Sequence, residues 1–323
     1  MTSNTKVFFV FLLFMASLCG TRVQAQTYPV RPITIVVPLP PGGGGADTLA
    51  RILADRLGSL LGEPIVVENI VGAGGTIGVA HVVRAKADGY TLSMGSWVTH
   101  VAGSLVYPVQ YDVLEDLTPI SHVSDAPYWI VARKNLPASN LRELVDWLKL
   151  NPGKATAGTL GVGSGSHICT RYLQNAAGVE IQFVPYRGGP AAMQDLLAGR
   201  IDIMCDYAPN SLGNVRGEQI KALGVMAKHR WFASPDTLTV DEQGMPGIYF
   251  SSWLGLWAPK DTPSAIVEKL STSIGKVLTD PAVRQKIANL GQEVVPPEEQ
   301  QPSVFARLLK LEFEKWRPII KAQ

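Results

Sequence analysis

Residues 37–51 of the chain read VPLPPGGGGADTLAR. The apolar run that leads into them, ITIVVP (33–38), predicts a strand, and ADTLARILADRLGSLLG (46–62) predicts a helix. A glycine-rich turn between a strand and a helix exposes backbone N–H groups at the positive end of the helix dipole, where anions bind. The stretch therefore predicts an α/β fold with an anion site, and it leaves open which anion is bound.

The same arrangement recurs along the chain. Three further glycine turns follow predicted strands: VGAGGTIG (71–78), GVGSGSH (161–167) and RGGPAAM (187–193). Strands that alternate with helices at this spacing favour mainly parallel sheets flanked by helices. A chain of 323 residues exceeds the usual span of one hydrophobic core, so we expect two domains.

The pattern changes near residue 250. SSWLGLWAP (251–259) is apolar and extended, and three predicted helices complete the chain. A terminal helical block often packs back on the first unit, so we predict domain I at 26–125 plus 250–323, and domain II at 126–249. Two linkers would then form a hinge, and ligands bind open α/β sheets at the crevice beside the carboxyl ends of the strands.

The first residues resemble a secretory signal peptide. Lys6 precedes VFFVFLLFMASL (7–18), which is too short to span a membrane, and Val23-Gln24-Ala25 suits cleavage after Ala25. Lipidation at Cys19 fits less well because Leu18 precedes it. Cleavage would remove two bases and no acids, and 29 bases less 2 leaves 27 against 27 acids. A neutral exported chain gives no reason to expect nucleic acid or membrane surfaces as partners.

Two cysteines, Cys169 and Cys205, remain after cleavage. In an oxidising compartment such a pair is a disulfide candidate, and we predict the bridge. The alternative is that both thiols are buried separately as small hydrophobic groups.

The glycine turns lack the residues that several chemistries need. Ala46-Asp47-Thr48 follows the first turn, where a P-loop requires a lysine, and Asp47 would repel a polyphosphate. In the second turn the third glycine, Gly78, comes too late for a dinucleotide motif. Around Ser164 the glycine spacing departs from a nucleophile elbow, and the five histidines form no metal-binding motif. We therefore expect no cofactor, no metal and no catalytic residue.

Neutral hydrogen-bond donors remain: the turn backbones and the side chains of Ser96, Thr99, Ser164, Ser166 and Tyr186. Neutral donors at helix N-termini hold a carboxylate without burying a cation. The pattern favours a carboxylate receptor. Alternatives are glycines that only form tight turns, an exported α/β hydrolase-like enzyme, or an interaction module.

Several ordered motifs now identify a family. YPVRPITIVVPLPPGGGGADTLAR, PIVVENIVGAGGTIG and DGYTL are followed by NPGKATAGTLGVGSGSH, FVPYRGGPAAMQDLLAGRIDIMCD and SWLGLWAPKDTP. From about Tyr28 to its C-terminus the chain resembles the periplasmic solute-binding proteins of tripartite tricarboxylate transporters, also called the Bug family. Leu39 departs from the pattern, because an aromatic residue is usual there.

The resemblance implies a monomeric Venus flytrap in the periplasm that closes on a small organic carboxylate and delivers it to integral-membrane permease subunits. It also implies the ligand-binding positions. One end of the ligand would meet Pro41, Gly42, Gly43, Gly44, Gly45, Gly72, Ala73, Gly74 and Gly75. The other end would meet Ser164, Ser166, His167, Tyr186, Gly188, Gly189 and Asp206. Asp47, Ser96 and Thr99 complete the candidate site.

The identity of the acid stays open at this point: a dicarboxylate or tricarboxylate, an acidic amino acid or an aromatic acid. Trp97 and Trp129 could line an aromatic pocket, although we favour a place in the core for both. Asp206 could accept a hydrogen bond from a ligand or could cap the helix that follows it.

Overall fold

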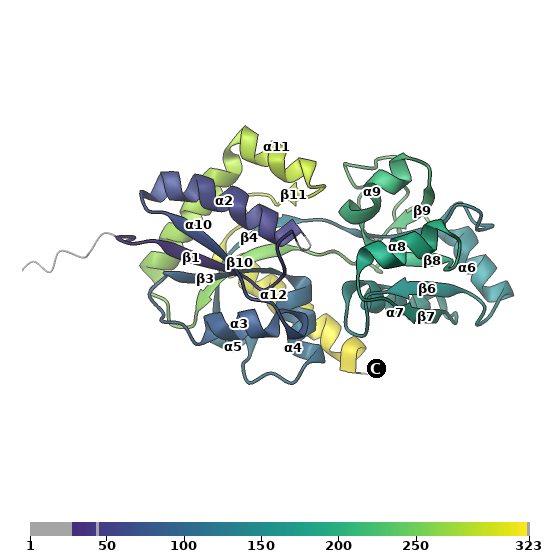
Figure 1. Cartoon of the computed structure of the whole chain (residues 1–323), viewed down its shortest axis with the longest axis horizontal. Helices are drawn as coiled ribbons and strands as arrows, with labels where there is room; N and C mark the ends of the chain where they lie inside the picture. Colours follow the sequence, from purple (N-terminus) through teal and green to yellow (C-terminus); the bar gives the residue numbers. More distant parts are fainter. Residues whose placement is uncertain (1–27, 43–44, 322–323) are drawn as a thin grey trace, which may run out of the picture.

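The computed structural model describes residues 28–42 and 45–321, and Figure 1 shows two lobes side by side. The predicted signal peptide and two turn residues, Gly43 and Gly44, lie outside the described residues. Within those residues no helix has the length and apolar character to cross a membrane.

The first lobe is built on a six-stranded sheet of order β11-β4-β10-β3-β1-β2. Its strands are β1 (Ile33–Val37), β2 (Ile65–Asn69), β3 (Thr91–Ser96), β4 (Leu117–Asp125), β10 (Leu254–Pro259) and β11 (Glu293–Val294). Its helices are α2 (Ala46–Leu61), η2 (Ala73–Gly75), α3 (Thr76–Val83), η3 (Val98–Ala102), α4 (Gly103–Val106), α5 (Val113–Asp116), α10 (Ser264–Thr279), α11 (Pro281–Asn289) and α12 (Pro302–Lys321).

The second lobe is built on a five-stranded sheet of order β7-β6-β8-β5-β9. Its strands are β5 (Tyr128–Arg133), β6 (Thr156–Thr159), β7 (Gln182–Pro185), β8 (Ile203–Tyr207) and β9 (Ile220–Val225). Its helices are α6 (Leu141–Leu150), α7 (Gly165–Ala177), α8 (Gly189–Leu197) and α9 (Ala208–Arg216).

The chain passes between the lobes twice, and the two crossings lie side by side. Pro127 and Ser251 form an isolated antiparallel bridge, and the Tyr128 N–H donates to the Phe250 carbonyl at 2.9 Å. The first crossing leaves β4 at Asp125, and the second returns the chain to β10. We propose that these paired crossings are the hinge and that they mark the domain boundaries predicted at 125/126 and 249/250.

The prediction of a two-domain α/β fold is confirmed, but both sheets are mixed rather than mainly parallel. In the first sheet β1 pairs parallel with β2 and β3, while β10 runs antiparallel to β3 and β4. In the second, β6 pairs parallel with β7 and β8, while β5 runs antiparallel to β8 and β9. The reason is the path of the chain, because the strands that follow a crossing, β5 and β10, enter their sheet from the other lobe.

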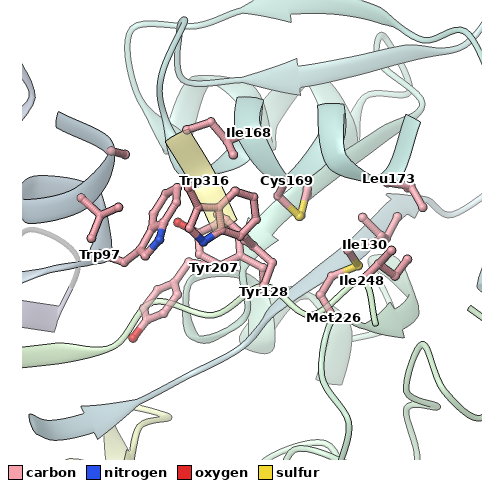
Figure 2. Packing of buried hydrophobic residues seen from close by; sticks show 14 of the residues in the cluster. Trp97, Tyr128, Ile130, Ile168, Cys169, Leu173, Tyr207, Met226, Ile248 and Trp316 are labelled. Carbon is pink, nitrogen blue, oxygen red and sulfur yellow. A yellow bond between two sulfur atoms is a disulfide. The ribbon is translucent and has the colours of Figure 1, made fainter. Parts of the chain in front are cut away.

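Trp97 and Trp129 lie in the core. Neither side chain is exposed. Trp97 packs edge to face against Phe250 and Trp316, with ring centroids 4.8 and 5.2 Å apart, and Figure 2 shows Trp97 beside Trp316. Trp129 packs against Trp231 and donates its indole N–H to Ser211. The core alternative that we favoured from the sequence is therefore confirmed.

Candidate functional site

The turn after β1 is organised by a buried carboxylate. Asp47 is 4% exposed, and one of its oxygens accepts from the Gly42 N–H at 3.0 Å and from Arg51. The other accepts from Asn69 at 2.9 Å and from Arg51 at 3.0 Å. Asn69, at the end of β2, also donates to the Leu39 carbonyl. Asp47 thus connects the first turn to β2. Its oxygens bond to the protein here, whereas the sequence led us to expect contact with the ligand.

This network also sets the ionisation of Asp47. Burial favours the neutral acid, but the hydrogen bonds from Arg51, Gly42 and Asn69 outweigh it and hold the pKa of Asp47 below its usual value. The carboxylate is ionised and its charge is compensated by Arg51, which is half-exposed. The first N–H groups of α2 have no acceptor within the helix.

The turn after β2 is closely packed. Gly72, Ala73, Gly74 and Gly75 all have positive φ, from +45° to +135°. A β-carbon at Gly74 would lie 2.6 Å from the Tyr107 ring, and one at Gly75 would lie 2.7 Å from Thr99. Glycine is therefore required here by both backbone conformation and space.

Ser96 ends β3 and Thr99 lies in η3, and both are buried. The Thr99 hydroxyl is used locally, since it accepts from the Ser96 N–H at 3.0 Å and pairs with the His100 ring at 2.9 Å. Thr99 therefore shapes the start of η3.

The turn after β6 is held by hydroxyl groups. Ser164 caps α7 by accepting from the His167 N–H at 3.2 Å and donates to the Gly161 carbonyl at 2.7 Å. The Ser166 hydroxyl accepts from the Leu160 N–H at 2.9 Å. Both hydroxyls, expected to face the ligand, thus shape their own turn. The remaining first-turn N–H groups of α7 are its free donors.

His167 is buried and packs on Phe183, and its Nδ1 has no hydrogen-bond partner among the described residues. Burial, and then the Arg171 charge, lower the pKa of His167, so the ring is neutral.

The fourth turn contributes less than expected. The Tyr186 hydroxyl donates to Asp195 at 2.8 Å, which anchors it to α8 rather than leaving it free. Gly188 has extended backbone, and a β-carbon at Gly189 would meet nothing within 4 Å. This end of α8 is therefore open.

Asp206 lies at the end of β8, just before α9. Burial raises the pKa of Asp206 to about 6, and contacts with Ser211 and Asn210 on α9 oppose that rise. These contacts hold Asp206 against α9 through side chains, while the N-cap of α9 is Tyr207, without a side-chain capping bond. One carboxyl oxygen, Oδ2, remains without a hydrogen-bond partner in the described part of the chain.

The first and third turns are linked across the lobes by residues that sequence reasoning missed. Gln292, from the segment between α11 and β11, lies against Gly45 and accepts from the Ser124 hydroxyl at 2.7 Å. Its amide also lies near the Tyr207 hydroxyl of the second lobe. Tyr207 packs on Tyr128, with ring centroids 5.7 Å apart, and the Tyr128 hydroxyl lies against Gly165.

The only available sequence signal for Tyr128 and Tyr207 was their position at ends of predicted strands. No local sequence motif indicates a binding role for Gln292. Together these three residues connect the N-terminus of α2 to the N-terminus of α7.

A separate cavity of about 470 Å³ lies at the paired crossings. It is lined by Asp125, Tyr249, Glu312, Lys315 and Trp316, among others, and by none of the four turns. Burial raises the pKa of Asp125 to about 6 and that of Glu312 above its usual value. Its lining mixes these acids with the basic residues Lys228, Arg230 and Lys315, and it is separate from the glycine turns.

The chain has two α/β lobes joined by two crossings. Gln292, Tyr207 and Tyr128 connect the N-terminus of a helix in one lobe to that in the other. This is the architecture of a solute-binding protein. Solved structures of similar proteins agree. The malate-bound MatC protein of Rhodopseudomonas palustris is 34% identical, with a TM-score of 0.78, over 91% of this chain and 100% of that one. A second R. palustris protein, solved with adipate, is 31% identical, with a TM-score of 0.78, over 91% of this chain and 97% of that one.

The chain belongs to the receptors of the tripartite tricarboxylate transporter family, whose model matches residues 49–323. Among its relatives is BugT of Bordetella pertussis, 34% identical over 98% of this chain and 97% of that protein. The resemblance noted from the sequence motifs is therefore confirmed.

Proposed function

We propose that the chain is a periplasmic receptor that binds a small dicarboxylate between its lobes, as a monomer, and delivers it unchanged to membrane permease subunits. The observation that carries this proposal is the linkage of two helix N-termini, one from each lobe, through Gly45, Gln292, Tyr207, Tyr128 and Gly165. Helix N-termini offer neutral donors to a carboxylate at either end of such a ligand.

Two similar receptors support the choice of a dicarboxylate, because their structures hold malate and adipate. Both acids carry a carboxylate at each end, which suits a site with donors in both lobes. Tricarboxylates and acidic amino acids also carry a carboxylate at each end but add a third charged group, and an aromatic acid such as benzoate carries only one carboxylate. All three classes serve as comparison ligands. Export fits the predicted signal peptide at 1–25, which lies outside the described residues.

Binding without turnover is the outcome that the side chains favour. The Ser164 hydroxyl is occupied by the Gly161 carbonyl and by its capping contact. A serine–histidine pair does exist, with the Ser93 hydroxyl 3.1 Å from His100, but neither side chain is exposed. The pair is therefore enclosed within the first lobe, and burial lowers the pKa of His100 to about 3.

Isothermal titration calorimetry of the chain from residue 26 onward tests the proposal. We expect one site that binds L-malate or adipate, with weaker binding of citrate, L-glutamate and benzoate. Chromatography of the recovered acid should show no product. Small-angle scattering should show a smaller radius of gyration with ligand, because a ligand that bridges both lobes stabilises the closed form. Absence of binding by all five acids would refute the receptor function, and binding without compaction would refute the bridging geometry.

A further inference from the structure

The amide of Gln292 is a buried donor without an acceptor. Its side chain is 1% exposed, and Nε2 has no hydrogen-bond partner among the described residues. The Ser124 hydroxyl donates to Oε1 at 2.7 Å, so the other end of the amide, Nε2, is the one turned outward. A buried N–H group left unpaired costs free energy, so its orientation points to a missing partner.

The direction in which Nε2 points identifies that partner. It lies against Gly45, the N-cap of α2, so closely that a β-carbon at Gly45 would overlap it. α2 has 16 residues, and its first N–H groups have no acceptor within the helix. An amide N–H and a helix N-terminus are both donors and cannot satisfy each other. A negatively charged acceptor placed between them would satisfy both.

The second lobe adds another donor at the same place. The Tyr207 hydroxyl is buried and has no hydrogen-bond partner in the described part of the chain, and the Gln292 amide lies near enough to influence its pKa. Burial, followed by the charge of Asp125, raises the pKa of Tyr207, so the hydroxyl keeps its proton and can donate it. Figure 2 shows Tyr207 beside Tyr128 at this boundary.

We propose that Gln292 and Tyr207 bind one carboxylate of the ligand at the N-terminus of α2, Gln292 from the first lobe and Tyr207 from the second. This inference rests on the proposed receptor function and assigns two side chains to it. A carboxylate held by both lobes at one end couples recognition to closure, because only the closed form brings the two donors to the same oxygen atoms.

Calorimetry with L-malate and adipate as probes tests the assignment. Gln292→Leu keeps the size of the side chain and removes the N–H group, and we expect about 10- to 100-fold weaker binding, the range for a hydrogen bond to a charged group. Gln292→Glu replaces the amide donor by a carboxylate that would face the ligand carboxylate. We expect that variant to lose about 100-fold or more at pH 7.5, while the helix dipole keeps its thermal stability at or above wild type.

Gln300→Leu is the matched control. Gln300 is also a buried glutamine of the C-terminal segment, but its amide donates to the Val295 carbonyl at 2.9 Å. We expect that variant to lose thermal stability and keep wild-type affinity. Tyr207→Phe should weaken binding by about 10-fold.

The outcomes separate the two proposals. If the wild type binds neither probe, the receptor function for these acids fails. If the wild type binds and Gln292→Glu binds equally well, the assignment of Gln292 is wrong while the receptor function stands. A thermal melt of each variant shows whether it is folded, and Gln292→Glu decides the matter if Gln292→Leu does not fold.

Discussion

The turn after β1 and the turn after β6 perform the same task with different chemistry. Both place the N-terminus of a helix near the boundary between the lobes. The first is held by a buried, charged carboxylate, Asp47, with Arg51 and Asn69 around it. The turn after β6 is held by the hydroxyls of Ser164 and Ser166, and among the described residues its hydrogen bonds involve no charged side chain.

This difference teaches how each lobe keeps its donors available. A carboxylate near an anion site is tolerable only because Arg51 balances its charge. In the second lobe hydroxyls need no balancing charge, but they hold the turn less strongly. There the disulfide between Cys169 on α7 and Cys205 on β8, with Cα atoms 5.9 Å apart, ties the helix to the sheet. We therefore expect the stability of the turn after β1 to depend on charge and pH, and that of the turn after β6 to depend on whether the disulfide is reduced.

The largest expected effect comes from removing the disulfide. The bridged residues are 36 positions apart, and both side chains are fully buried. For a loop of that length the chain-entropy model gives a loss of about 3–4 kcal/mol in the free energy of unfolding. Chemical denaturation of Cys169→Ala/Cys205→Ala measures it.

Alkylation of the denatured exported protein, followed by intact-mass measurement, is the accompanying check. Two alkylated thiols without reductant would show that the protein does not carry the bridge in solution. An unchanged denaturation midpoint in the double variant would mean that the second lobe does not depend on the disulfide for its stability.

Asp47→Asn should have the next largest effect. The amide NH2 group of the new side chain would face the N–H donors of Gly42 or Arg51 without an acceptor between them. We therefore expect a loss of about 2 kcal/mol in the free energy of unfolding and weaker binding of the acid. Because the folded pKa of Asp47 is depressed, its contribution is present above pH 4, the unfolded value, and is lost as pH falls through the folded pKa.

Denaturation of both proteins from pH 3 to pH 8 measures this. The stability gap should be greatest near neutrality and should narrow below pH 4. A gap that does not vary with pH would mean that Asp47 acts through packing and not through its charge. Arg51→Ala, at a half-exposed residue, should cost less than Asp47→Asn.

Ser164→Ala should have the smallest effect. It removes one neutral capping contact, so we expect a loss of about 1 kcal/mol in stability and a modest loss of affinity. Ser166→Ala is the matched variant, since its hydroxyl serves the same turn. Calorimetry and thermal melts measure both. A loss of all affinity in either variant would place a hydroxyl directly on the ligand and end the contrast with the charged first turn.

The sequence by itself determined the features that depend on local pattern. Alternating apolar runs predicted the strands, and glycine turns with helix-start signals predicted where helices such as α2 and α7 begin. The cysteine pair suggested the bridge, and ordered motifs identified the family. The strand and helix predictions succeed because strand and helix periodicities, and the need for glycine at positive φ, act over a few residues.

Only the tertiary structure decided which side chains are free to bind. Gln292 meets Ser124 across 168 positions, and Trp97 is enclosed by Phe250 and Trp316 from distant segments. The candidate hydroxyls of Thr99, Ser164 and Tyr186 turned out to be engaged within their own lobes. The direction of β5 and β10 likewise depended on how the chain crosses between lobes. Such contacts follow from the path of the whole chain, and a local pattern cannot specify them because it does not encode which distant residues become neighbours.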